Sequence, residues 1–165
     1  MTFLQDDADR IILNHVLDGL VNWEDVNRPE FYQKSTAKSI AWAIIKFKKA
    51  HHRLPKRDEL ITTIDLKKSR LTEELAMLYL TSNPIDNETL EGLIKWWKMQ
   101  AMLVITYEEN IAKDLLTEEE KDKLKKISEK TKSGQWQKAA HDYVEALWIR
   151  VCDPKFLKRE RLPVA

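Results

Sequence analysis

The chain has 165 residues, of which 43% are hydrophobic and 33% are charged, and its net charge is only +1. This length allows a buried core, and the composition is typical of a soluble, helix-rich protein rather than a disordered one. The low net charge excludes the global attraction for polyanions of a histone-like protein, and a single cysteine, Cys152, excludes an internal disulfide or a thiolate metal cluster.

The N-terminal segment reads Met-Thr-Phe-Leu-Gln-Asp-Asp, which is acidic where a secretory signal needs positive charge. No apolar run approaches the roughly 18 residues that a membrane-spanning helix needs. We therefore expect a cytoplasmic protein that does not contact a membrane.

Short helices are predicted for the first half of the chain. The first runs from about Asp6 to about Leu20, with an apolar stripe that contains Ile12, Val16 and Leu20. A turn of helix follows at residues 23–26. A longer helix is then expected over residues 30–49.

That second long helix places Ile40, Ile44 and Phe47 toward the core. Pro55 ends it and starts another helix, because proline presets the first turn. The new helix carries acidic residues in its first turn and buries Leu60, Ile61 and Ile64. A short helix over residues 73–80, capped by Thr72, completes the first half.

A long helix capped by Asn87 is predicted to run to about Leu116, and it carries a seam of residues at alternating steps of four and three. The seam consists of Leu90, Ile94, Trp97, Ala101, Val104, Glu108, Ile111 and Leu115. Glu108 is its one charged interruption. Thr117 and Glu120 form a capping box, so residues 118–132 either start a new helix or continue the old one after a kink.

A second seam follows the break at Ser133 and Gly134. It contains Trp136, Ala140, Tyr143, Leu147 and Val151. Since no strand-like alternation of useful length occurs, we predict an all-α fold. The expected domains are a small helical bundle head, residues 1–83, a long antiparallel helical hairpin, residues 84–152, and a basic tail, residues 153–165.

The hairpin is where we expect contact with another protein. Neighbouring side chains on a helix point about 100° apart, so if Trp97 packs in the seam, Trp96 faces elsewhere. Tryptophan is enriched at interface hot spots, although the head covering Trp96 is an equal alternative. The predicted oligomer or partner interface is Leu90, Ile94, Trp96, Trp97, Ala101, Trp136, Tyr143 and Leu147.

A basic cluster between residues 46 and 57 contains no acidic residue. Its members, which are possible nucleic-acid contacts, are Lys46, Lys48, Lys49, Arg53, Lys56 and Arg57. The alternative, which we favour, is a solvated helix end with Phe47 in the core.

Catalytic, cofactor and metal sites are not predicted. The three glycines cannot form a phosphate-binding loop, and the four histidines lack the spacing of metal ligands. Adjacent carboxylates such as Asp6 and Asp7 point to different helix faces, which is wrong for an acid and a base acting on one bond.

Four motifs follow one another along the chain. They are Asp7-Ala8-Asp9-Arg10-Ile11-Ile12-Leu13, Phe31-Tyr32, Leu54-Pro55-Lys56-Arg57-Asp58-Glu59-Leu60 and Tyr79-Leu80-Thr81-Ser82-Asn83. Together with the long helices that follow, they resemble the N-terminal domain of DnaB-type replicative DNA helicases, especially the shorter phage forms.

The resemblance implies a collar domain for DNA replication in a bacterial or phage-infected cell. Such a domain forms homo-oligomers from dimer to hexamer and recruits a primase or a helicase loader. ATP and Mg²⁺ are then expected only in a full-length helicase, whose motor would follow the linker at residues 153–165. The alternatives are a stand-alone DNA-binding replication accessory protein, such as a helicase loader, and a structural adaptor.

Overall fold

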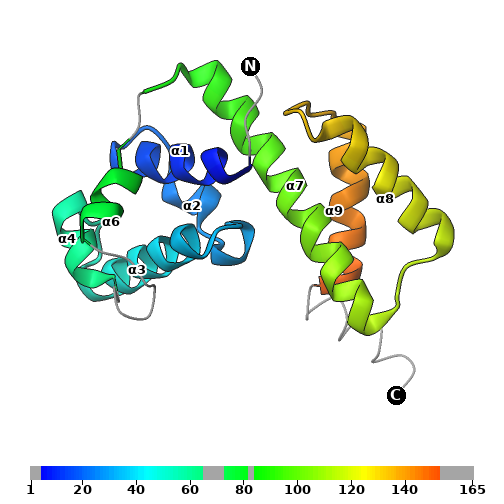
Figure 1. Cartoon of the computed structure of the whole chain (residues 1–165), viewed down its shortest axis with the longest axis horizontal. Helices are drawn as coiled ribbons and strands as arrows, with labels where there is room; N and C mark the ends of the chain where they lie inside the picture. The colour runs from blue at the N-terminus through cyan, green and yellow to red at the C-terminus, as the bar shows by residue number, and fades with distance from the viewer. Residues whose placement is uncertain (1–4, 65–72, 82–83, 153–165) are drawn as a thin grey trace. The chain divides into compact units, whose positions relative to one another are not determined.

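A computed structural model describes residues 5–64, 73–81 and 84–152 (Figure 1). These residues form helices and connecting turns without a strand, which confirms the all-α prediction. They divide into two compact units, which we call the N-terminal unit, residues 5–94, and the C-terminal unit, residues 95–152. Of the predicted features, the cap at Thr72, the motif residues Ser82 and Asn83, and the basic tail lie outside the described residues.

The N-terminal unit is built from short helices and the first turns of a long one. Its elements are α1 (Gln5–Leu17), α2 (Trp23–Val26), the 3-10 turn η1 (Pro29–Phe31), α3 (Ser35–His51), α4 (Arg57–Thr63), α6 (Glu73–Tyr79) and the start of α7 (Asn87–Lys113). Helix α3 packs against α1, η1 and α4, and α4 packs against α6.

Helix α1 ends earlier than the sequence predicts. Gly19 takes a φ of +76°, which glycine adopts without steric cost, and its N–H bonds the Val16 carbonyl. The chain therefore turns after Leu17 and leaves Leu20 51% exposed, while Ile12 and Val16 are fully buried. The expected place of Leu20 on the apolar stripe is wrong for this reason.

Helix α3 begins at Ser35 rather than at residue 30 because the preceding loop is tied to α1. The buried carboxylate of Asp9 accepts hydrogen bonds from the backbone N–H groups of Gln33 and Lys34, at 2.8 and 3.3 Å. Tyr32 is also buried and donates its hydroxyl to the Val26 carbonyl at 2.8 Å.

The rest of this unit follows the predicted helices closely. The predicted inward residues of α3 and of the region of α4 are all buried, namely Ile40, Ile44, Phe47, Leu60, Ile61 and Ile64. Helix α6 covers residues 73–79 of the predicted 73–80. Local signals such as Pro55 are therefore sufficient to place these elements.

The C-terminal unit consists of the rest of α7, α8 (Glu118–Thr131) and α9 (Lys138–Cys152). The predicted capping box is present, since Thr117 Oγ1 accepts from the Glu120 N–H and Glu120 Oε1 accepts from the Thr117 N–H. Asn110 Oδ1 accepts the N–H groups of Leu115 and Leu116, which ends α7. Residues 118–131 are therefore a new helix and not a continuation of α7.

Hydrogen bonds fix the directions of these helices. The Tyr107 hydroxyl of α7 donates to the Lys121 carbonyl near the start of α8, so α7 and α8 run antiparallel. Lys113 at the end of α7 donates to the Val151 carbonyl at the end of α9, so these two run parallel. Figure 1 shows α8 and α9 beside the later turns of α7.

Candidate interaction surfaces

Most residues of the predicted partner interface are buried within the protein. Leu90, Trp96, Trp97, Ala101 and Leu147 are buried, and Ile94, Trp136 and Tyr143 are partly exposed. Their role in binding a partner therefore stays a prediction. Trp96 is the clearest case among the buried residues.

Trp96 is 2% exposed and donates its indole N–H to the Thr131 carbonyl at 2.6 Å. Gln100, one turn further along α7, donates to Thr131 Oγ1 at 2.7 Å. The last residue of α8 thus satisfies two buried donors of α7, as buried polar groups require. Trp96 is covered by its own chain, and the sequence pattern did not identify Thr131 as its partner.

The seam on α7 changes character along the helix. Its N-terminal part is buried at Leu90, Trp97 and Ala101, whereas Ile111 is 86% exposed and Leu115 is 41% exposed. A group of adjacent exposed apolar side chains is typical of a surface that a partner covers, and Ile111 and Leu115 are such neighbours. The distal end of the seam is therefore one of the apolar surfaces exposed among the described residues, others being Trp42 of α3 and Leu75 and Leu78 of α6.

Acidic side chains surround this exposed end. We call the segment around the α7–α8 turn the acidic tip; it comprises Glu108, Ile111, Asp114, Leu115 and Glu118. The side chains of Asp114 and Glu118 are 85% and 92% exposed, with Lys121 at 3.7 and 3.1 Å. Hydrogen bonding to Glu118 raises the pKa of Lys121 above its ordinary value.

The tip is held in place from α9. Arg150 donates to the Leu115 carbonyl at 3.1 Å and to Glu120 Oε1 at 2.7 Å. This bond lowers the pKa of Glu120 from 4.5 to about 2, against the opposing effect of burial. Charge-assisted bonds of this kind fix geometry, so the tip is presented as a defined surface.

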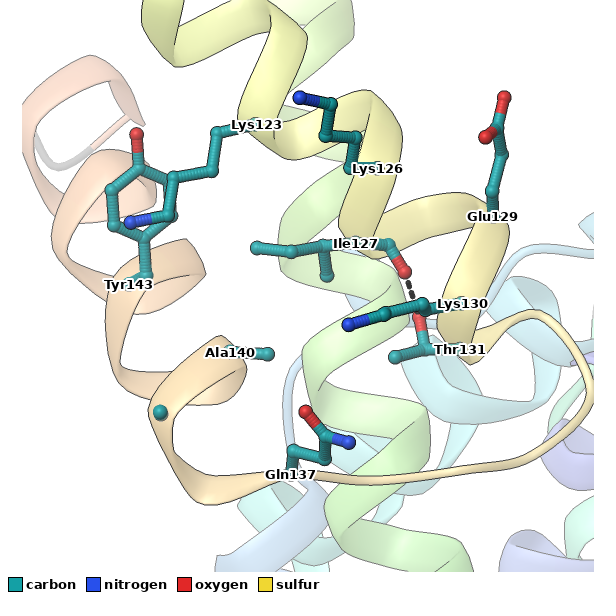
Figure 2. A pocket seen from close by; sticks show the side chains of 10 residues that line it. Lys123, Lys126, Ile127, Glu129, Lys130, Thr131, Gln137, Ala140 and Tyr143 are labelled. Atoms are coloured by element: carbon teal, nitrogen blue, oxygen red, sulfur yellow. Dashed lines mark hydrogen bonds between the residues drawn. The ribbon is translucent and has the colours of Figure 1, made fainter.

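A groove of about 590 Å³ opens between α8 and α9 (Figure 2). Its lining is mainly apolar, and the residues that contribute to it are Lys123, Lys126, Ile127, Glu129, Lys130, Thr131, Gln137, Ala139, Ala140 and Tyr143. In Figure 2 the side chains of Ile127 and Lys130 point into the space between the helices, and Glu129 points away from it. The Lys123 amine lies 4.1 Å from the centre of the Tyr143 ring, within cation–π distance.

The groove is basic as well as apolar. Residues 121–138 contain seven lysines and two acidic residues, Asp122 and Glu129. No role was predicted for these lysines from the sequence. A stronger signal was available in the spacing of Lys123, Lys126 and Lys130, which places three cations on the helix face that carries Ile127.

Acidic partners neutralise half of the predicted nucleic-acid cluster. Lys48 pairs with Glu24, Arg53 with Glu59 at 2.7 Å, and Arg57 with Asp18 at 2.7 Å. The bond from Arg53, with a second from the Lys56 N–H, lowers the pKa of Glu59 to about 2.

The other three members, Lys46, Lys49 and Lys56, are exposed to solvent. Phe47 is only 6% exposed and has the Arg53 guanidinium 5.0 Å from its ring centre. This confirms the expectation that Phe47 belongs to the core. The contact of the six basic residues with nucleic acid stays a prediction, and Lys46, Lys49 and Lys56 are its three exposed members outside these ion pairs.

Arg57 instead belongs to the architecture of the N-terminal unit. Its guanidinium donates to the Leu80 carbonyl at 2.7 Å and to Asn14 Oδ1 at 3.1 Å. Asn14 in turn donates to the Tyr79 carbonyl at 3.1 Å, so two carbonyls at the end of α6 are satisfied by side chains of α1 and α4. These bonds within the unit fix the positions of the Arg57 and Asn14 side chains.

Cys152, at the end of α9, is the one cysteine of the chain. Burial, together with the nearby carboxylate of Glu109, raises the pKa of its thiol to about 11. A thiol that stays protonated near neutral pH is a weak nucleophile and a weak metal ligand. Within residues 5–64, 73–81 and 84–152, no cluster of three His, Cys, Asp or Glu side chains is placed to hold a metal ion.

Among the described residues, no helix combines the length and the apolar character that a membrane crossing requires. Comparisons with protein families, with curated proteins and with solved structures found no match to this chain. Its function must therefore be argued from its own surfaces.

Proposed function

We propose that this chain is the N-terminal assembly and partner-docking domain, the collar, of a replicative DNA helicase. In this role it supports ring oligomerisation and recruits a primase or a helicase loader. The order of the four sequence motifs supports the proposal, as does the 27-residue helix α7 that follows the helices of the first half of the chain.

In the proposed arrangement, residues 1–83 form a helical bundle head and residues 84–152 form the helical hairpin. Residues 153–165 are the linker. The two helices that carry most of the two seams, α7 for Leu90 to Leu115 and α9 for Trp136 to Val151, are the interacting helices of this hairpin. They run parallel to each other rather than antiparallel as expected, because α8 supplies the antiparallel return between them. The predicted contacts with other copies of the chain and with a partner protein both lie in the hairpin.

The observation that carries the assembly role is the exposure of the distal seam. Ile111 and Leu115 continue the heptad spacing of buried residues, yet they are 86% and 41% exposed. Heptad seams are stabilised when another helix covers them, and self-association is the commonest way to do so.

The test is the oligomeric state of the purified chain, measured by sedimentation velocity over increasing protein concentration. We expect a concentration-dependent dimer or larger ring, and we expect Ile111→Glu to shift it to monomer. Ala112→Glu is the matched control, because it adds the same charge at the neighbouring exposed position of the same helix turn. A wild-type chain that stays monomeric at high concentration would overturn the assembly role.

A second candidate is a stand-alone DNA-binding accessory protein, and the exposure of Lys46, Lys49 and Lys56 favours it. Fluorescence anisotropy with labelled single-stranded and duplex DNA tests it at two salt concentrations. Binding that weakens with salt and is reduced by Lys46→Glu with Lys49→Glu would favour this function. Substitution of the paired Arg53 is unsuitable here, because it also breaks the ion pair with Glu59.

A further inference from the structure

The acidic tip and the α8–α9 groove are two surfaces of opposite chemistry on one unit. The tip presents exposed apolar side chains among carboxylates, and the groove presents an apolar floor among lysines. We propose that the acidic tip of one copy of this chain docks into the α8–α9 groove of a second copy. The inference rests on the proposed assembly role, because it names the contact that joins successive subunits.

The apolar parts of the two surfaces match in kind and size. Ile111 and Leu115 are the exposed apolar side chains of the tip, and the groove offers about 590 Å³ lined by Ile127, Ala140 and the Tyr143 ring. This volume is in the range that accepts a few side chains. Burying Ile111 there would remove its apolar surface from water at about 25 cal/mol per Å².

The charges match in sign. Glu108 precedes Ile111 by three residues on α7, and Asp114 follows the last residue of that helix with a φ of +48°. Lys123 and Lys130 are seven residues apart and flank Ile127, which is about 10.5 Å. Glu108 can therefore face a lysine while Ile111 faces Ile127, and it acquires a role in place of an unexplained break in the seam.

The contact is heterologous, because the tip and the groove are different surfaces of each subunit. An open assembly then has one unoccupied tip at one end and one unoccupied groove at the other. Repetition of such a contact produces a ring if the rotation closes and a filament if it does not. A symmetric pairing of two tips would stop at the dimer.

Two variants remove one surface each. The groove variant is Lys123→Glu with Lys126→Glu and Lys130→Glu, and the tip variant is Glu108→Lys with Ile111→Glu. We expect each variant alone to raise the dissociation constant for self-association by roughly tenfold or more, since charge reversal adds repulsion to the lost attraction.

Matched controls separate the groove from general charge. Lys125→Glu changes a neighbouring exposed lysine of α8 that does not line the groove, and we expect little effect on self-association. Ala140→Leu fills the groove without a change of charge and is expected to weaken association. Ala146→Leu places the same side chain on an exposed position of α9 outside the groove.

The decisive experiment mixes the two variants. The groove variant keeps an intact tip and the tip variant keeps an intact groove, so a heterologous contact predicts a one-to-one heterodimer that does not grow further. Sedimentation of a mixture with one variant carrying a fluorescent label measures this directly. Recovery of binding in the mixture also proves that both variants are folded.

The outcomes distinguish this inference from the proposed function. If the wild type forms oligomers and the groove variants leave them unchanged, the tip-to-groove contact is wrong and the assembly role survives. If the wild type is monomeric at high concentration, both fail. If the groove variants lose only binding to labelled single-stranded DNA, the groove is a polyanion site and the inference is overturned.

Discussion

The two units of this chain are stabilised in different ways. The N-terminal unit is crossed by polar side chains that bond distant backbone segments, among them the buried Asp9 and Asn14 and the partly exposed Arg57. The C-terminal unit has its specific bonds at the helix ends, where Thr131, Val151 and Leu115 accept donors from other helices. Bonds at the ends leave the sides of α8 and α9 available as surface.

The comparison indicates which unit can bind a partner along the sides of its helices. A unit with many long-range side-chain bonds tolerates little rearrangement, because each broken bond leaves a buried group unsatisfied. A unit fastened at its ends can accept new neighbours along its sides without losing those bonds. The predictions below test this difference, in order of decreasing effect.

The largest expected effect is in the apolar interior of the C-terminal unit. Trp96→Ala is expected to lower the free energy of unfolding by about 3–5 kcal/mol, because it leaves a cavity and removes the bond to Thr131. Trp42→Ala is the matched control, since Trp42 of α3 is 60% exposed, and it should cost about 1 kcal/mol or less. Urea unfolding followed by far-UV circular dichroism measures both. Equal losses would contradict the burial of Trp96.

The second prediction breaks the polar network of the N-terminal unit. Arg57→Ala removes donors from the Leu80 carbonyl, Asn14 and Asp18, and we expect a loss of about 2–3 kcal/mol. Lys56→Ala changes the adjacent exposed lysine and should stay within about 0.5 kcal/mol. The same unfolding titration compares the two variants. If Arg57→Ala were as mild as its neighbour, these long-range bonds would not be what stabilises the unit.

One substitution made in both units compares them directly. Tyr32→Phe removes a hydroxyl bonded to the Val26 carbonyl in a fully buried setting, so about 1–2 kcal/mol should be lost. Tyr107→Phe removes a similar bond to the Lys121 carbonyl in a partly exposed setting, where water replaces the hydroxyl and about 0.5 kcal/mol should be lost. Thermal unfolding of both variants compares the two losses of stability. A larger loss for Tyr107→Phe would reverse the comparison.

The smallest effect concerns acid pH, and it involves both units. The folded-state pKa values of Glu120 and Glu59 are about 2, below the ordinary 4.5. The stability that their bonds contribute is therefore present above about pH 4.5 and is lost as the pH falls toward 2.

Unfolding titrations between pH 5 and pH 2 test this dependence. Glu120→Gln should flatten the profile of the C-terminal unit and Glu59→Gln that of the N-terminal unit, each as a small change because both side chains contact solvent. Profiles identical to the wild type would show that these ion pairs do not contribute.

Sequence patterns predicted the elements whose signals are local. Pro55 and the capping box of Thr117 and Glu120 act on their own helix turns, so the starts of α4 and α8 were predictable. The start of α3 was not, because Asp9 fixes the preceding loop from 24 residues away. Periodicity also identified which faces of α3 and α4 are apolar.

Partners across helices could not be predicted in the same way. The heptad pattern of α7 shows which residues are apolar, but it does not show that Thr131 covers Trp96 or that Ile111 lacks cover. The groove depends on two helices, since Ile127 and Tyr143 come from α8 and α9 and become neighbours only when these pack. The basic cluster shows the same limit, because Glu24 and Asp18 pair with its members Lys48 and Arg57 from other segments.

The half-buried thiol of Cys152 makes the surroundings of the end of α9 measurable by chemical labelling. With a pKa of about 11, only about one thiol in ten thousand is ionised at pH 7, so an alkylating reagent reacts slowly while α9 stays in place. Removal of Cys152 from the carboxylate of Glu109 and from the protein interior would lower the thiol pKa and speed the reaction. Because the chain has one cysteine, the rate of labelling reports on the surroundings of a single known position without any engineered probe.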